Sequence, residues 1–189
     1  MPSFTLHTPD SAPEGSAERL RRIEQAWSFI PNLHRTLAES PVVLEGYDTL
    51  FGLVGRSSLT PAEQQVAFLA VSVVHGCEYC VSGHSVLATM AGLDAASIEA
   101  LREGGDLPDP RQQALRRFVV TVVESRGMAG DAAVDAFLAA GFTKAQLLEV
   151  VMVVAAKTIS NYVNHLTHTP LDAFMAGTAW VAPQRRAPA

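Results

Sequence analysis

The sequence has few of the residues that mark extracellular, nucleic-acid-binding or membrane proteins. Its 189 residues include two cysteines, too few for a disulfide framework. Acidic residues outnumber basic ones by 19 to 14, which gives a formal net charge of −5 and argues against a nucleic-acid partner. No run of about 18 uncharged apolar residues occurs, so no membrane-spanning helix and no membrane partner are predicted.

The first residues also lack the marks of a secretion signal. Met1 to His7 contain neither a basic segment nor an apolar one. We therefore expect a cytoplasmic protein, in a compartment that keeps thiols reduced. Apolar residues still make up 48% of the chain, enough for a full hydrophobic core in a single domain.

Proline is missing from two long segments, 62–107 and 111–169. An interior proline costs a helix about 3 kcal/mol, so its absence permits long helices there. Thr60, Pro61 and Glu63 form a helix-start signal at the first segment. The predicted helices cover residues 16–30, 32–39, 42–55, 61–75, 78–90, 94–103, 111–124, 132–140 and 143–166.

Two runs rich in β-branched residues, 118–123 and 150–154, have strand propensity. The glycines and prolines that flank them lie too far apart for strands of normal length, so we interpret both runs as helical. The sequence thus predicts an all-α protein with one helical domain over residues 16–180. A flexible arm is expected at 1–15 and a flexible tail at 181–189.

Both cysteines lie in one motif, Gly76-Cys-Glu-Tyr-Cys-Val-Ser-Gly-His84. On a helix, Cys77, Cys80 and His84 share one face, and Cys80 and His84 are four residues apart. The thiolate is the reactive form of cysteine, and a helix N-terminus or an imidazole favours it. A second thiol can resolve a sulfenic acid to a disulfide. The motif therefore predicts a redox centre with Cys77, Cys80 and His84 as catalytic residues.

The spacing alone leaves the roles of the two thiols open. The helix dipole favours Cys77 as the low-pKa thiol, whereas contact with His84 favours Cys80. We favour Cys80 as the thiol that attacks peroxide and Cys77 as the resolving thiol, through which an external reductant restores the pair.

Two other interpretations of the motif compete with this one. The cysteines could be small buried hydrophobic residues. They could also bind zinc together with His84 and either His75 or His165. A C-x-x-C that opens an apolar helix suits zinc poorly, so we expect neither a metal nor another cofactor.

The motif and its surroundings resemble the alkylhydroperoxidase D-like (AhpD-like) branch of the carboxymuconolactone decarboxylase superfamily. The segments that carry the resemblance are Leu59-Thr-Pro-Ala-Glu63, Leu69-Ala-Val-Ser72 and Gly76 to His84. The resemblance is strongest over residues 40–105. Residues 161–165 and 169–172 also resemble the end of an uncharacterised peroxidase-related subgroup.

The resemblance implies an AhpD-like helical bundle that assembles as trimers or hexamers. It also implies an enzyme that reduces a hydroperoxide through a C-x-x-C disulfide, with the second cysteine attacking, in agreement with Cys80. A thiol or a lipoylated protein would restore the dithiol. The decarboxylase branch lacks these cysteines, so their presence argues against decarboxylation.

The sequence departs from the family pattern at two positions of the proton relay. Gln65 stands where relatives have a glutamate, and an amide cannot take up a proton at neutral pH. Tyr79 stands between the cysteines, where some relatives have a histidine. We name Gln65, Tyr79 and His165 as possible relay residues, although His165 could simply belong to a polar helix end. The thinner relay keeps a non-enzymatic redox sensor, or a metal-binding helical protein, as the alternative function.

One charged residue needs a partner if it is buried. Lys157 lies inside an otherwise apolar predicted helix. We expect a carboxylate, such as that of Glu149, to pair with it.

Overall fold

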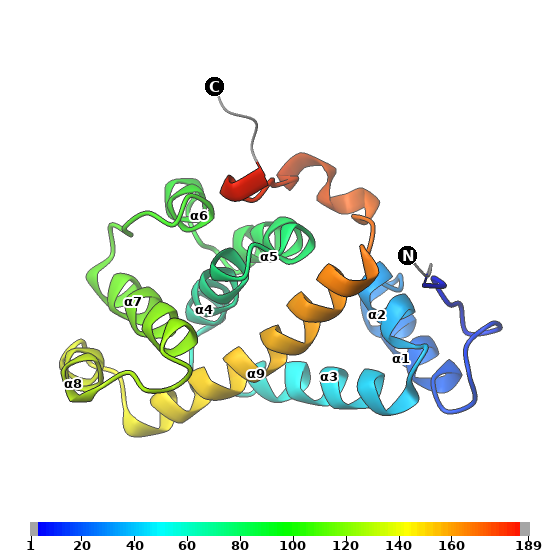
Figure 1. Cartoon of the computed structure of the whole chain (residues 1–189), viewed down its shortest axis with the longest axis horizontal. Coiled ribbons are helices and arrows are strands. Elements are labelled where there is room, and N and C mark those ends of the chain that lie inside the picture. Colours follow the sequence, from blue (N-terminus) through cyan, green and yellow to red (C-terminus); the bar gives the residue numbers. More distant parts are fainter. Residues whose placement is uncertain (1–3, 186–189) are drawn as a thin grey trace.

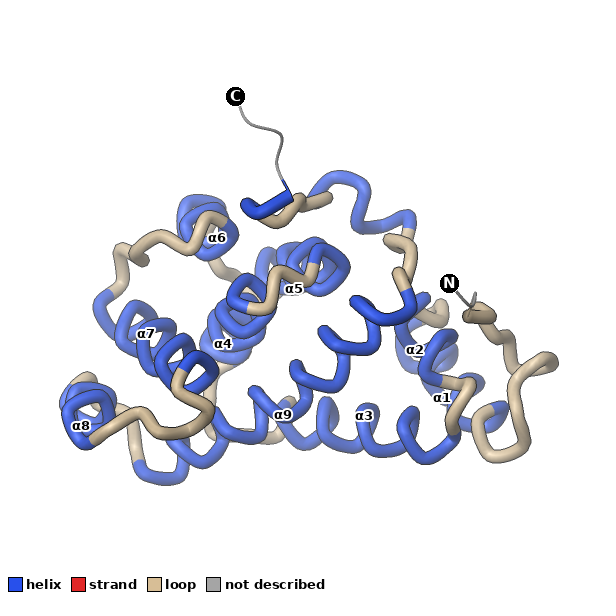
Figure 2. Tube along the Cα trace, viewed as in Figure 1, coloured by secondary structure: helices blue, strands red, loops and turns tan. Residues whose placement is uncertain are grey.

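The computed structural model describes residues 4–185, and every regular element in that range is a helix (Figure 1). The α-helices are α1 (Ala17–Trp27), α2 (Asn32–Leu37), α3 (Pro41–Val54), α4 (Pro61–Val74), α5 (Glu78–Met90), α6 (Ala95–Arg102), α7 (Pro110–Glu124), α8 (Asp131–Ala139) and α9 (Lys144–Thr167). Two short 3₁₀ helices follow, η1 (Ala173–Thr178) and η2 (Pro183–Arg185). Figure 2 shows no strand in the described range, which confirms the all-α prediction.

Local signals in the sequence explain where the two central helices begin. The Thr60 hydroxyl accepts a hydrogen bond from the Glu63 N–H, and the Glu63 carboxylate accepts one from the Thr60 N–H. This capping box confirms the predicted start of α4 at Pro61. Thr143 and Gln146 form the same reciprocal pair at the start of α9. The two β-branched runs lie inside α7 and α9, where burial outweighs their strand propensity.

The longest helix, α9, crosses the molecule and separates two groups of helices (Figure 1). Its 24 residues span about 36 Å. The larger apolar cluster surrounds α4, which packs against α5, α7 and α9. A smaller cluster lies toward α1, α2 and α3 and includes both cysteines. The dithiol therefore lies in the smaller core, beside the long helix.

Both ends of the described chain contact the helical body. His7 is buried, and its Nε2 is 2.9 Å from a carboxylate oxygen of Glu39. The flexibility expected for residues 1–15 stays a prediction, and no sequence pattern indicated this contact.

After α9, the chain folds back over α5, where Met175 and Trp180 are buried. The segment expected to be a flexible tail, 181–189, packs against the helical body at its start. Ala182 is buried, and its N–H donates to the Glu78 carboxylate. The rest of that expected tail, residues 186–189, lies outside the described residues.

The outer face of α9 is apolar as well as its buried face. Leu148, Val151, Tyr162 and Leu166 are each half exposed or more. Among residues 4–185, no single helix is long and apolar enough to cross a membrane; only α8 and α9 taken together pass that test, and they are bent by 115°.

Candidate active site

A tight turn between α4 and α5 places both cysteines at the start of α5. Gly76 has a φ of 67°, a left-handed conformation that glycine adopts without strain. Cys77 follows as the N-cap residue, and its N–H donates to the Ser72 carbonyl over 2.9 Å. Cys80 lies in the first turn of α5. Both thiols are therefore near the positive end of the helix dipole, as the motif predicted.

The two thiols face the buried side of α9. Cys77 and Cys80 are 1% and 2% exposed, and neither forms a disulfide in this structure. The Asn164 side-chain amide is a donor to both: its Nδ2 lies 3.2 Å from the Cys80 Sγ and 3.9 Å from the Cys77 Sγ. The Ser160 Oγ is 3.9 Å from the Cys80 Sγ. One face of α9 thus supplies polar contacts to the dithiol.

His84, one turn beyond Cys80, is held by Gln65 of α4. The His84 Nδ1 is 2.9 Å from the Gln65 Oε1. An amide oxygen only accepts hydrogen bonds, so Nδ1 carries the hydrogen and Nε2 is left as an acceptor. Burial, reinforced by the charge of Lys157, lowers the pKa of His84 well below its ordinary value. His84 is therefore neutral at pH 7.

Lys157 of α9 does not have the partner that the sequence suggested. Glu149 does not pair with it, because the Glu149 carboxylate accepts from the N–H and hydroxyl of Ser58. Lys157 is 0% exposed, its Nζ has no hydrogen-bond partner, and it lies 5.6 Å from the centre of the Phe68 ring. Its charge instead acts on Cys80 and His84.

The surroundings shift the two thiols in opposite directions. Burial alone raises the pKa of Cys80, but the hydrogen bond from Cys77 and the charge of Lys157 outweigh it and hold that pKa well below the ordinary value. The same hydrogen bond, together with burial, raises the pKa of Cys77 far above its ordinary value. The pair thus favours a Cys80 thiolate beside a protonated Cys77.

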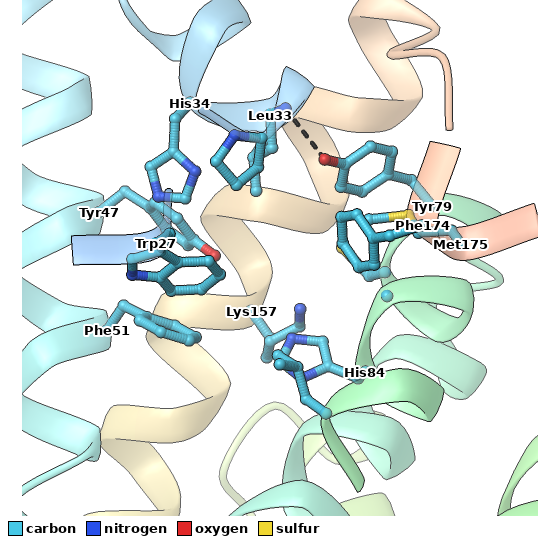
Figure 3. Close-up of a pocket in the computed structure, with 14 residues that line it drawn as sticks. Trp27, Leu33, His34, Tyr47, Phe51, Tyr79, His84, Lys157, Phe174 and Met175 are labelled. Atoms are coloured by element: carbon cyan, nitrogen blue, oxygen red, sulfur yellow. Dashed lines mark hydrogen bonds between the residues drawn. The ribbon is translucent and has the colours of Figure 1, made fainter. Parts of the chain in front are cut away.

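Cys80 lines a small apolar cavity between α3, α5, α9 and η1 (Figure 3). Its volume is about 50 Å³, room for a few water molecules or a small organic group. The rings and apolar side chains in its wall include Trp27, Leu33, Tyr47, Phe51, Leu87, Phe174 and Met175. Figure 3 shows Lys157 and His84 pointing into the same space from α9 and α5. A substrate in this cavity would meet the thiol, the imidazole and the ammonium together.

Cys77 lines a different cavity on the other side of the dithiol. This second cavity is larger, about 560 Å³, and its lining is rich in polar groups. Its lining includes His75, Glu78, Asn164, His165, His168, Thr169 and Arg185. Cys80 does not line this cavity, and Cys77 does not line the first. Each thiol therefore faces its own cavity.

Tyr79, whose role in the relay stays a prediction, links three parts of the fold. Its hydroxyl donates to the Asp172 carboxylate and accepts the Leu33 N–H over 3.1 Å. Asp172 also accepts the Asn32 N–H at the start of α2. Burial, with the Asp172 hydrogen bond, raises the pKa of Tyr79 above its ordinary value. Tyr79 therefore stays protonated and ties α5 to α2 and to the segment before η1.

His165 is exposed and lines the second cavity, which Cys77 also lines, and its place in the relay stays a prediction. Asn164, beside it in sequence, contacts both thiols. Asn164 shares the buried face of α9 with Lys157, seven residues earlier. This helical spacing was the signal in the sequence that could have identified it.

The alternative zinc site does not form in the described chain. No group of three or more His, Cys, Asp or Glu side chains in residues 4–185 is arranged to hold a metal ion. His75, one of the proposed ligands, instead places its Nδ1 2.9 Å from the Asn161 Oδ1.

The segment that carries the site is similar to a known protein family. Residues 41–115, which contain the dithiol and its two helices, match the carboxymuconolactone decarboxylase family. That segment is therefore similar to the family, and the fold of the whole chain is the AhpD-like fold of solved structures. No functionally curated protein matches the sequence.

Solved structures share this fold over almost the whole chain. A protein from Ralstonia eutropha JMP134, described as an alkylhydroperoxidase AhpD core and an uncharacterized peroxidase-related protein, superposes with a TM-score of 0.81 and is 20% identical, covering 91% of this chain and 93% of that one. An uncharacterized peroxidase-related protein from Silicibacter sp. TM1040 gives a TM-score of 0.79 at 19% identity, covering 93% and 94%.

A third structure adds a different chemistry to the same fold. It is a cysteine-to-alanine variant of the debrominase Bmp8 in complex with 2,3,4-tribromopyrrole, with a TM-score of 0.74, 19% identity and coverage of 94% and 95%. At identities of 19–20%, these superpositions show a shared fold and do not show a shared reaction.

Proposed function

We propose that this protein is a thiol-dependent peroxidase in which Cys80 attacks the peroxide and Cys77 resolves the product. The observation that carries this proposal is the separation of the two thiols. Cys80 faces an apolar cavity that also holds Lys157 and His84, whereas Cys77 faces a larger polar cavity. The opposite pKa directions favour the same division, because the thiolate is the nucleophile.

The reaction balances with the groups that the site provides. The Cys80 thiolate forms a bond to the terminal peroxide oxygen as the O–O bond breaks, which gives a Cys80 sulfenic acid and an alcohol after protonation. The Cys77 thiol then attacks the Cys80 sulfur, releasing water and forming the disulfide. Two equivalents of an external thiol, or a lipoylated protein, reduce that disulfide from the Cys77 side.

His84 supports this chemistry as a hydrogen-bond acceptor. Gln65 fixes the tautomer with the hydrogen on Nδ1, so Nε2 is available for the O–H of a hydroperoxide. Because Gln65 cannot carry a proton onward, the relay ends at His84. We therefore expect slower turnover than in relatives that have a glutamate at that position.

The test is a hydroperoxide time course on reduced protein, followed by intact mass. Wild type is expected to form an internal disulfide, C77S to stop at a sulfenic acid and C80S to stay reduced. Circular dichroism of each variant controls for folding. If C80S is oxidised while C77S stays reduced, the assigned roles are reversed. If all three proteins stay reduced at modest peroxide excess, the peroxidase proposal is wrong. Disulfide formation that is complete but too slow for turnover would favour a redox sensor.

Reductive dehalogenation is the second candidate, favoured by the aromatic wall of the Cys80 cavity. Rings of Trp27, Tyr47, Phe51 and Phe174 line it, which suits a flat ring. In that reaction an aryl bromide and the dithiol would yield the arene, bromide, a proton and the disulfide. Bromide release from a brominated pyrrole, measured beside peroxide consumption on the same preparation, separates the two functions.

Self-association accompanies either function in our proposal. The exposed apolar residues on the outer face of α9 include Leu148 and Leu166, at 68% and 73% exposure. A surface of this kind is typical of an interface between subunits. The proposed trimer or hexamer is tested by light scattering coupled to gel filtration, with L166K expected to reduce the assembled fraction.

A further inference from the structure

The Cys80 cavity contains one charged side chain that is fully buried. This residue, Lys157, is one of only two lysines in the sequence. Its Nζ has no hydrogen-bond partner among the described residues. A buried charge destabilises a protein by several kcal/mol unless an opposite charge lies close to it, and Cys80 is the group in this cavity that can supply one.

The other titratable groups that line the cavity do not supply a mobile proton at pH 7. They are His34, Tyr47, Tyr79 and His84, besides Cys80 itself. Burial lowers the pKa values of both histidines, so they are neutral, and raises those of both tyrosines, so they hold their protons. Lys157 is therefore the only ammonium or guanidinium group that faces the substrate space of this cavity.

We propose that Lys157 is a catalytic acid, which donates the proton that the leaving oxygen of an organic hydroperoxide requires. This inference rests on the proposed peroxidase function and goes beyond it. As the Cys80 sulfur bonds to the terminal oxygen and the O–O bond breaks, the remaining alkoxide takes a proton from the Lys157 Nζ. The products are a Cys80 sulfenic acid, a neutral alcohol and a neutral Lys157 amine.

With this proton transfer, the Lys157 ammonium and the Cys80 thiolate are either both present or both absent at each stage of the reaction. Before reaction, the Lys157 ammonium is paired with the Cys80 thiolate. Once the thiolate is consumed, a charged Lys157 would be left alone among aromatic rings and neutral histidines, and giving up its proton removes that cost. When a reductant cleaves the Cys77–Cys80 disulfide, the Cys80 thiol returns a proton to the Lys157 amine and restores the ion pair.

The substrate class follows from this role. An alkoxide is the conjugate base of an alcohol about as weakly acidic as water, whose pKa is about 15.7, so its departure depends on a proton donor. A carboxylate is the conjugate base of an acid with a pKa of about 4, so a peracid needs no donor. The apolar wall of the cavity, with Leu33, Phe51 and Met175, favours the organic substituent of an alkyl or aralkyl hydroperoxide.

The experiment compares cumene hydroperoxide with peroxybenzoic acid in single-turnover oxidation at pH 7. The proteins are wild type, K157R, K157M and the matched control K144M, which changes the exposed lysine at the start of α9. Each rate is divided by the fraction of Cys80 thiolate, measured from its ultraviolet absorbance. Arginine keeps the positive charge but does not release a proton in proteins, so K157R separates charge from proton donation.

With cumene hydroperoxide, K157R and K157M are expected to lose about 10²–10⁴-fold in the corrected rate. With peroxybenzoic acid the loss should be below about tenfold, and K144M should match wild type with both oxidants. Equal losses with the two oxidants would overturn the proposal, because Lys157 would then act only on the thiolate or on the fold. If wild type reacts with neither oxidant, the proposed function fails and not this inference alone.

A second measurement keeps the inference testable if neither variant folds. Wild type is compared in ordinary and heavy water, with rates again corrected for thiolate. Proton transfer during O–O cleavage predicts a slower reaction of cumene hydroperoxide in heavy water and no such slowing for peroxybenzoic acid. The absence of a difference between the oxidants contradicts the role of Lys157.

Discussion

The two thiols are three residues apart, yet their surroundings differ in almost every respect. Cys80 faces a cavity of about 50 Å³ with aromatic walls and one buried cation. Cys77 faces one of about 560 Å³ lined largely by histidines, an asparagine and an exposed ion pair. The same side-chain type therefore has a pKa lowered on one side and raised on the other.

The comparison shows that the motif alone does not assign the roles of the thiols. Both cysteines lie at the N-terminal end of α5, so the helix dipole acts on both. Part of the difference comes from α9: the Lys157 charge and the Ser160 hydroxyl act on Cys80, and the Asn164 amide lies closer to the Cys80 Sγ than to the Cys77 Sγ. Changes on α9 should therefore alter the contrast between the thiols more than changes within the motif's own helix.

The largest expected effect on the pKa of Cys80 comes from replacing Asn164, whose amide donates to its sulfur. N164A removes a donor to the Cys80 thiolate, worth about 1.5–3 kcal/mol, and should raise the pKa of Cys80 by about 1–2 units. N164D places a carboxylate there and should raise it further. Thiolate absorbance as a function of pH measures both shifts.

N161A is the matched control for these two variants. Asn161 is a buried asparagine on the same helix, but it contacts His75 and Ser72 and not the thiols. Its replacement should leave the thiolate titration unchanged. A shift in N161A as large as that in N164A would show that packing of α9, and not the hydrogen bond, sets the pKa of Cys80.

The next effect concerns a histidine in the wall of the Cys80 cavity. Burial lowers the pKa of His34 to about 4, against a smaller opposite effect of Asp48. Unfolded histidine titrates at about 6.5, so between pH 6.5 and pH 4 the unfolded state binds more protons and stability falls as the pH falls. His34 should therefore account for a loss of about 2 kcal/mol between pH 7 and pH 5.

Urea unfolding at the two pH values measures this loss. H34F keeps a ring beside Trp27 and Tyr47 and should remove most of the His34 contribution. H165F changes an exposed histidine of the other cavity and should leave the pH dependence as in wild type. An unchanged slope in H34F would mean that other groups cause the acid sensitivity.

Much of the fold could be predicted because its signals are local. The capping box of Thr60 and Glu63 lies within four consecutive residues, and the proline-free segments predicted the long helices. The motif likewise placed Cys80 and His84 one turn apart on α5, with Cys77 as its N-cap residue, since a helix converts spacing directly into geometry. The family resemblance agreed with these local patterns.

The rest of the site depends on contacts between residues far apart in sequence. Asn164 meets Cys80 across 84 residues, and Asp172 meets Tyr79 across 93. The apolar segment around Lys157 raised the case of a buried lysine, but it did not indicate that its charge would act on Cys80. Reasoning from charge alone therefore paired Lys157 with Glu149, the nearest carboxylate along the helix.

A smaller effect should separate the functions of the two cavities. Leu87 lines the Cys80 cavity and Thr169 the Cys77 cavity, and both are partly exposed. Filling either space with tryptophan should disfavour the molecule that uses it by about 1–3 kcal/mol, or roughly 5- to 150-fold in rate. L87W should slow oxidation by cumene hydroperoxide, and T169W should slow reduction of the disulfide by dithiothreitol.

Each variant serves as the control for the other, because both introduce the same side chain beside the same dithiol. The two half-reactions are measured separately, starting from fully reduced and fully oxidised protein. If L87W and T169W slow the same half-reaction, both reactants use one cavity, and the division between the thiols is lost.

The smallest effect is expected at the rim of the Cys77 cavity. The Arg185 Nη1 lies 3.1 Å from the Glu78 carboxylate, but the arginine side chain is 73% exposed. An exposed ion pair contributes about 0.2–1 kcal/mol, so R185A should lower the free energy of unfolding by less than about 1 kcal/mol. Glu78 keeps the Ala182 N–H as a hydrogen-bond donor in that variant. Added salt should weaken the wild-type pair and bring the two proteins closer in stability. A larger loss of stability that does not depend on salt would mean that the residues around the Arg185–Glu78 pair are packed as closely as those of the Cys80 cavity. The contrast between the two cavities would then not extend to the protein surface.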